Sequence, residues 1–120
     1  MTTLRVKGSG TVLAADVRHA RSVVSRTRGL MLRPALEPGC GLDIRPCGSI
    51  HMMFMRFSID AVFYDREGRV TRVAHRLRPW IGLAFGGRGA RGVVELPADA
   101  ADGVQVGDVL EFDDTGGTSP

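Results

Sequence analysis

The sequence predicts a mainly β domain of the α+β class, built on a small, partly closed antiparallel sheet with a barrel-like shape and one or two short helices. Three observations support this prediction. Sixteen glycines and six prolines in 120 residues favour tight turns over long helices. The apolar runs are short and rich in β-branched residues. Hydrophobic residues make up 43% of the chain, which is enough for one compact core.

The first part of the chain is expected to form three strands and a helix. Residues 4–6 and 11–17 are apolar runs on either side of a glycine-rich turn, so we predict a strand in each. Ser22 is a suitable N-cap for a short helix that Gly29 would end. After a loop rich in proline and glycine, residues 42–44 are predicted to form the next strand.

The clearest local signal is a β-hairpin. Residues 59–64 and 69–75 are rich in side chains that favour strands, and the sequence Asp65-Arg66-Glu67-Gly68 separates them. An aspartate at the start and a glycine at the end fit a type I turn followed by a left-handed residue. The two runs are therefore predicted to pair.

The rest of the chain is predicted to contain two more strands. Residues 93–96 and 109–112 are apolar and bounded by turn residues. Between them, residues 97–101 could form one helical turn. The glycine-rich segment 82–92 predicts no regular structure.

One domain is expected over residues 1–112, with a disordered acidic tail over 113–120. Charge is divided unevenly along the chain. Up to Arg91 there are sixteen basic and six acidic residues, and from Gly92 onward there are seven acidic residues and no basic one. Because the two parts partly neutralise each other on folding and no recognition motif is present, the sequence argues against nucleic-acid binding.

The sequence also predicts a cytoplasmic protein without membrane association. No window is apolar enough for a transmembrane helix, and the first residues lack the basic and apolar regions of a secretory signal. Cys40 and Cys47 are the only cysteines. In the cytoplasm we expect both to be reduced, although a disulfide between them is geometrically feasible.

Residues 49–64 place polar side chains in an otherwise apolar, strand-like run. A buried polar group without a partner costs roughly 2–7 kcal/mol, so such groups are paired or used. His51, Arg56 and Asp60 are therefore the candidate ligand-binding residues. Trp80, beside the glycine-rich loop, could stack on a ligand or cap the end of the barrel. An ion pair between Arg56 and Asp60 that only fixes the loop is the alternative.

A metal site in this run is not expected. Cys47, His51, Met53 and Met55 carry the soft donor atoms that suit Cu(I). The spacing of Cys47 and His51 matches no zinc pattern, however, and methionines interleaved with phenylalanine are typical of a core. We therefore predict no metal and no cofactor.

Several motifs occur in the order typical of a known family. They are the segment SIHMMFMRFSIDAVFYD, Arg28-Gly29-Leu30-Met31 before it, and Val94-Glu95-Leu96-Pro97 and Gly107-Asp108-Val109-Leu110 after it. This pattern resembles the family called domain of unknown function 192, which implies a compact β-rich domain and no particular function. Phe57 departs from the small polar residue common in the family, and Asp99 stands where glycine is frequent.

The sequence therefore favours a non-catalytic binding module for a small polar or anionic ligand near His51, Arg56 and Asp60. One alternative is a small acid–base enzyme that uses His51 and Asp60. The other is a protein-interaction domain that presents an apolar patch from Met52 to Phe57.

Overall fold

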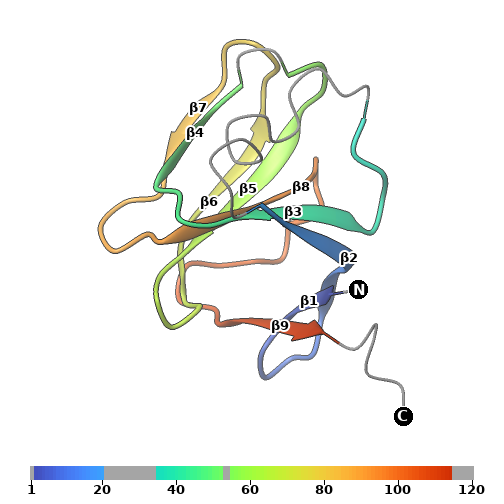
Figure 1. Cartoon of the computed structure of the whole chain (residues 1–120), viewed down its shortest axis with the longest axis vertical. Helices are drawn as coiled ribbons and strands as arrows, with labels where there is room; N and C mark the ends of the chain where they lie inside the picture. Colours follow the sequence, from blue (N-terminus) through green and yellow to red (C-terminus); the bar gives the residue numbers. More distant parts are fainter. Residues whose placement is uncertain (1, 21–34, 53–54, 115–120) are drawn as a thin grey trace.

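A computed structural model describes residues 2–20, 35–52 and 55–114 of the chain (Figure 1). In these residues the strands are β1 (Thr2–Val6), β2 (Val12–Ala20), β3 (Cys40–Ile44), β4 (Ser49–His51), β5 (Ile59–Tyr64), β6 (Val70–Leu77), β7 (Leu83–Phe85), β8 (Gly92–Pro97) and β9 (Leu110–Asp114). The mainly β prediction is confirmed.

Seven strands form one sheet in the order β6-β5-β8-β3-β2-β1-β9, and β4 pairs with β7 in a separate two-stranded sheet. An antiparallel bridge between Arg69 and Val109 brings the two edges of the large sheet together, so the sheet curls into a half-barrel. The prediction of an antiparallel sheet is wrong at one place, because β2 and β3 are parallel. The connection between these two strands is long enough for the crossover that parallel pairing requires.

The described residues contain no helix. The helix predicted from Ser22 to Gly29 lies outside them. The helical turn predicted at 97–101 is wrong, because this segment forms separate turns in which Ala100 and Asp102 each donate a backbone hydrogen bond to the carbonyl three residues earlier. Asp99 interrupts right-handed winding, since its φ of 76° lies in the left-handed region.

The predicted hairpin is confirmed as β5 and β6. Asp65 Oδ1 accepts hydrogen bonds from the backbone N–H groups of Glu67 and Arg69, each at 2.9 Å. Gly68 has a φ of 83°, which glycine adopts without steric cost. Local turn chemistry therefore sets the register of the strongest strand pair.

The strands predicted at 4–6, 11–17, 42–44, 93–96 and 109–112 are confirmed as β1, β2, β3, β8 and β9, with small differences at their ends. β9 continues to the last described residue, so the start of the predicted tail is a strand, and residues 115–120 lie outside the described part. The sequence missed β4 and β7, which are only three residues long each.

Each face of the large sheet is covered by its own apolar cluster. All six residues of β5 are buried, and alternate side chains point to opposite faces, with Tyr64 in one cluster and Phe63 in the other. We call these the Tyr64 face and the Phe63 face. Ile50 of β4 and Ala84 of β7 pack into the Phe63-face cluster.

The two-stranded sheet and the turn before β7 form a lobe on the Phe63 face, which we define as residues 49–52 and 78–86. In Figure 1 the lobe lies in the upper part of the molecule, whereas β1 and β9 lie in the lower part. The lobe therefore occupies one end of the long axis, away from the two terminal strands.

Candidate functional site

Asp60 is fully buried and holds three segments together on the Tyr64 face. Its Oδ1 accepts a hydrogen bond from the backbone N–H of Arg76 at 2.9 Å, and its Oδ2 accepts one from the backbone N–H of Ala101 at 3.0 Å. These bonds join β5 to β6 and to the turns that follow β8. Asp60 is thus a structural anchor with two charge-assisted hydrogen bonds.

The predicted ion pair between Arg56 and Asp60 is wrong, because the ion pairs of the described residues include none between these two side chains. Arg56 is exposed in the irregular segment before β5. Because Arg56 is not part of a strand, the alternation of side chains along β5 does not place it on the same face as Asp60.

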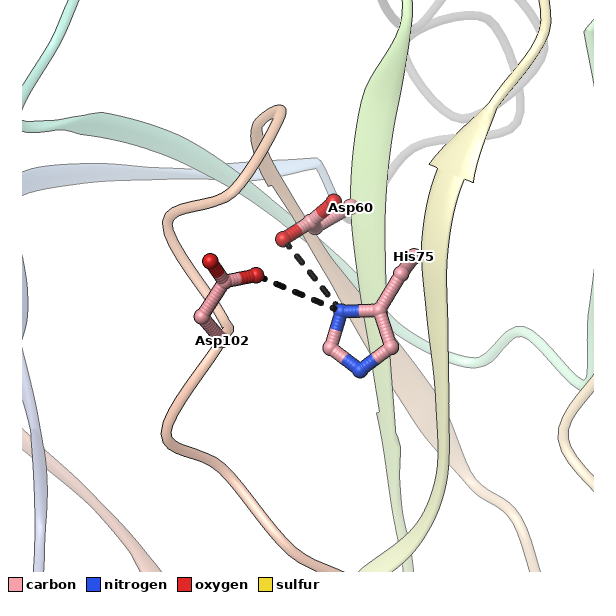
Figure 2. A group of neighbouring side chains, drawn as sticks. All are labelled: Asp60, His75 and Asp102. Carbon is pink, nitrogen blue, oxygen red and sulfur yellow. Dashed lines mark ion pairs between the residues drawn. The ribbon is translucent and has the colours of Figure 1, made fainter.

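His75 of β6, which was not among the candidate residues predicted from the sequence, lies beside Asp60. His75 Nδ1 is 3.7 Å from Asp60 Oδ2 and 3.8 Å from Asp102 Oδ1 (Figure 2). A bulge in β6 accounts for this position, since Ile59 pairs with Leu77 while Ala61 pairs with Ala74, which leaves one extra residue on β6. Bulges re-aim side chains and are common next to functional sites.

Arg76 and Asp99 form an exposed pair next to this cluster. Arg76 Nε donates to Asp99 Oδ1 at 2.5 Å, and its terminal nitrogen donates to Asp99 Oδ2 at 2.9 Å. Hydrogen bonding to this guanidinium lowers the pKa of Asp99 below its ordinary value. Both residues have positive φ, 49° for Arg76 and 76° for Asp99, in the left-handed region that glycine adopts most readily.

The other predicted site residues belong to the lobe. His51 pairs with Leu83, and its side chain is exposed because its neighbour Ile50 faces the core. Trp80 donates its backbone N–H to the Met52 carbonyl at 2.7 Å, and its side chain is 52% exposed, so it does not cap a barrel end.

The predicted site is therefore divided between two parts of the molecule. Asp60 points to the Tyr64 face, whereas His51 and Trp80 lie in the lobe on the other face. His51 and Asp60 do not converge on one substrate position, as an acid–base pair must. In the predicted apolar patch from Met52 to Phe57, Met52 and Met55 are not exposed but buried in the core, and residues 53–54 lie outside the described residues.

Exposed apolar side chains occur in the lobe instead. Among the described residues six large apolar side chains are exposed, and four of them are Trp80, Ile81, Leu83 and Phe85. We call these four the apolar tip. Residues 68–94 contain six arginines and no acidic residue. The lobe itself thus combines uncovered apolar area with one exposed arginine, Arg78, and contains no acidic residue.

Glu95 is a buried acid without a hydrogen-bond partner. It lies on β8 between Leu42 of β3 and Ala61 of β5, both of which belong to the apolar Phe63 face. Its Oε1 makes no hydrogen bond, and burial raises the pKa of its carboxyl to about 7. Desolvation acts alone here, because no charged partner offsets it.

Asp43 of β3 is the other buried acid of the Tyr64 face, and both of its carboxylate oxygens have partners. The Tyr64 hydroxyl donates to Asp43 Oδ1, and His19 Nδ1 lies 2.9 Å from Asp43 Oδ2. Arg45 Nε donates to the Tyr64 oxygen at 2.9 Å. Desolvation raises the pKa of Tyr64, so its hydroxyl keeps its proton and remains a donor.

Fold and site together define a class of small, mainly β half-barrel domains with a short two-stranded lobe. The sequence profile of the domain of unknown function 192 (DUF192) family, described as "Uncharacterized ACR", matches residues 3–112. The chain therefore belongs to the DUF192 family, a family of unknown function, and the resemblance found in the sequence is confirmed.

Named relatives and a solved structure agree with this assignment. A UPF0127 protein of Thermococcus sibiricus is 34% identical over 113 residues, covering 89% of this chain and 72% of the relative. A UPF0127 protein of Pyrococcus furiosus is 32% identical over 108 residues, covering 86% and 91%. The crystal structure of a protein of unknown function from Novosphingobium aromaticivorans has a TM-score of 0.80 at 21% identity, covering 91% and 83%, and shows the fold alone.

No helix in the described residues is long and apolar enough to cross a membrane.

Proposed function

We propose that this protein is a non-catalytic binding module that holds an extended, acidic protein segment against its lobe. The observation that supports this most is the apolar tip, four large apolar side chains exposed within six consecutive residues, in a stretch of sequence (residues 68–94) that contains no acidic residue. Exposed apolar patches bordered by polar residues are typical of interaction sites.

The strand geometry directs the apolar tip outward. Ala84 is buried between Leu83 and Phe85, so these two side chains share the outer side of β7. Trp80 and Ile81 form the turn before β7, and the φ of 69° at Trp80 is rare for a bulky residue. Such outliers are concentrated at functional sites.

Charge complementarity supports an acidic partner. Arg56, Arg78 and Arg88 are exposed in or next to the lobe, where no acidic side chain balances them. Guanidinium groups bind carboxylates through two parallel hydrogen bonds, and arginine and aromatic residues are enriched in interfaces. These arginines favour the anionic of the two ligand classes, polar or anionic, that the sequence predicts.

The open edges of the small sheet favour an extended partner over a small one. Within the described part of the chain, β4 and β7 pair only with each other, so each has one unpaired edge. A peptide that adds a strand to such an edge gains main-chain hydrogen bonds and places alternate side chains on one face. A partner in which acidic and apolar residues alternate fits both the arginines and the apolar tip.

Fluorescence anisotropy with two labelled decapeptides tests this proposal. One peptide alternates glutamate with valine, and the other alternates lysine with valine. We expect saturable binding of the acidic peptide only, weakened at least 10-fold by Leu83→Ser and by Arg78→Glu. Val106→Ser removes an equally exposed apolar side chain outside the lobe, and Lys7→Glu reverses a charge in the β1–β2 turn, so neither should change binding.

Equal binding of both peptides, or equal weakening by Val106→Ser and Leu83→Ser, would contradict the proposal. Preferential binding of phosphatidylserine vesicles or of a single-stranded oligonucleotide would also contradict it, because the partner would then not be a protein segment.

A further inference from the structure

We infer that Asp60, His75 and Asp102 bind a divalent transition-metal ion. The three side chains come from β5, β6 and the turns after β8, and Figure 2 shows them converging on one point. This site lies on the Tyr64 face and not in the lobe, so it does not depend on the proposed peptide binding.

The distances between the side chains suit a shared ion better than direct hydrogen bonds. One ligand atom from each residue lies within 4.8 Å of the other two. The imidazole nitrogen is 3.7 Å from one carboxylate oxygen and 3.8 Å from the other, beyond the roughly 2.7–3.2 Å of an N–H···O hydrogen bond. Metal bonds of about 2.1 Å place neighbouring ligand atoms roughly 3–3.5 Å apart, so the two distances from His75 need to shorten by only a few tenths of an ångström. The two carboxylate oxygens lie within 4.8 Å of each other, and the exposed side chain of Asp102 is free to close the remaining distance.

Asp60 is the fixed ligand of this set. It is fully buried, and two backbone N–H groups orient its carboxylate. An ionised carboxylate has about four acceptor positions, so two hydrogen bonds leave lone pairs for a metal. Carboxylates that ligate metals are commonly held by outer hydrogen bonds of this kind.

His75 and Asp102 complete the site from the solvent side. The side chain of Asp102 is 69% exposed and that of His75 is 46% exposed, so an ion can reach the cluster without opening the core. The neighbouring guanidinium of Arg76 is occupied by Asp99, which keeps its positive charge paired outside the cluster. Two carboxylates and a neutral imidazole carry a net charge of −2, which favours a cation.

The donor set limits which metals fit. Calcium and magnesium prefer oxygen ligands only, whereas an imidazole nitrogen with carboxylate oxygens suits zinc and manganese. Three protein ligands leave at least one coordination position for water.

Isothermal titration of the EDTA-treated full chain with ZnCl₂ and MnCl₂ tests the inference. We expect one ion per chain, with binding weakened at least 10-fold by Asp102→Asn and by His75→Ala. Both changes affect exposed side chains, so the variants should fold, and far-UV circular dichroism checks this. Glu67→Gln, at an exposed acid in the β5–β6 turn, is the matched control and should bind like the unmodified chain.

A second readout locates the ion. Bound Mn²⁺ should broaden the amide resonances of residues 60, 75 and 102 and leave those of the lobe sharp. Absence of saturable binding, or binding that Asp102→Asn and His75→Ala leave unchanged, would overturn the inference. Metal binding without peptide binding would overturn only the proposed function.

Discussion

The Tyr64 face and the Phe63 face with its lobe differ in whether their groups have partners within the chain. On the Tyr64 face, Asp43 and Asp60 are buried acids whose oxygens all accept hydrogen bonds. On the Phe63 face, Glu95 is a buried acid with an unbonded oxygen, and the lobe above leaves its apolar tip exposed.

This difference separates structure from function. Where buried polar groups are satisfied, the hydrogen bonds explain why the residues are present. Exposed apolar area beside positive charge is typical of surfaces that bind another molecule. The contrast between the two faces therefore supports the lobe as the proposed peptide-binding surface.

Removal of Asp60, a buried acid with hydrogen-bond partners, should have the largest effect on stability. Asp60→Ala leaves the backbone N–H groups of Arg76 and Ala101 buried without acceptors, so we expect a loss of about 3–5 kcal/mol in the free energy of unfolding. Urea denaturation measures this loss. A loss below about 1 kcal/mol would show that Asp60 does not anchor the Tyr64 face.

Neutralising Glu95, the buried acid with an unbonded oxygen, should raise the free energy of unfolding, not lower it. The pKa of Glu95 is about 7 in the folded chain and 4.5 when unfolded, so between these values the folded state binds more protons and stability falls as pH rises. The penalty is absent below pH 4.5 and complete above pH 7. Glu95→Gln should therefore be more stable than the unmodified chain at pH 8, by about 3 kcal/mol, with no such gain at pH 4.

The control for Glu95 is the same pH series on Glu67→Gln, which should follow the unmodified chain. If Glu95→Gln gives no stabilisation at pH 8, Glu95 is solvated or paired, and the contrast between the two faces disappears.

Removing one hydrogen bond from the network around Asp43 should have an intermediate effect on the free energy of unfolding. Tyr64→Phe removes the hydroxyl that donates to Asp43 and accepts from Arg45. We expect a loss of about 1–3 kcal/mol, because a buried carboxylate oxygen loses a donor. Thermal unfolding measures it, and a value near zero would mean that His19 and Arg45 satisfy Asp43 without Tyr64.

The smallest effect on stability should come from the apolar tip. Ile81 is 73% exposed, so Ile81→Ser should change the free energy of unfolding by less than about 0.5 kcal/mol while it weakens binding of the acidic peptide. Urea denaturation and anisotropy on the same sample separate the two effects. A destabilised variant would show that the tip serves the fold.

Local chemistry explains what could be predicted from the sequence. The hairpin depends on Asp65 and Gly68, which lie within the turn itself, and the main strands are apolar runs that can be recognised singly. β4 and β7 are too short to give such a signal, and the parallel pairing of β2 with β3 depends on contacts far apart in sequence.

The candidate sites were harder to predict for the same reason. Asp60 stood out because a charged residue interrupts an apolar run, but its partners come from residues 76 and 101, which only the folded sheet brings close. His75 gave no signal of its own, since a bulge in β6 sets its direction. Trp80 stood out as the only tryptophan beside a glycine-rich loop, whereas the exposure of its neighbours in the lobe appears only in the folded chain.

Amide chemical-shift mapping with the acidic decapeptide shows which part of the molecule binds and is the decisive measurement. We expect shifts confined to the lobe, at residues 49–52 and 78–86, with β1 and β9 unchanged. Shifts centred on β1, β9 or the Tyr64 face, or no shifts at saturating peptide, would contradict it.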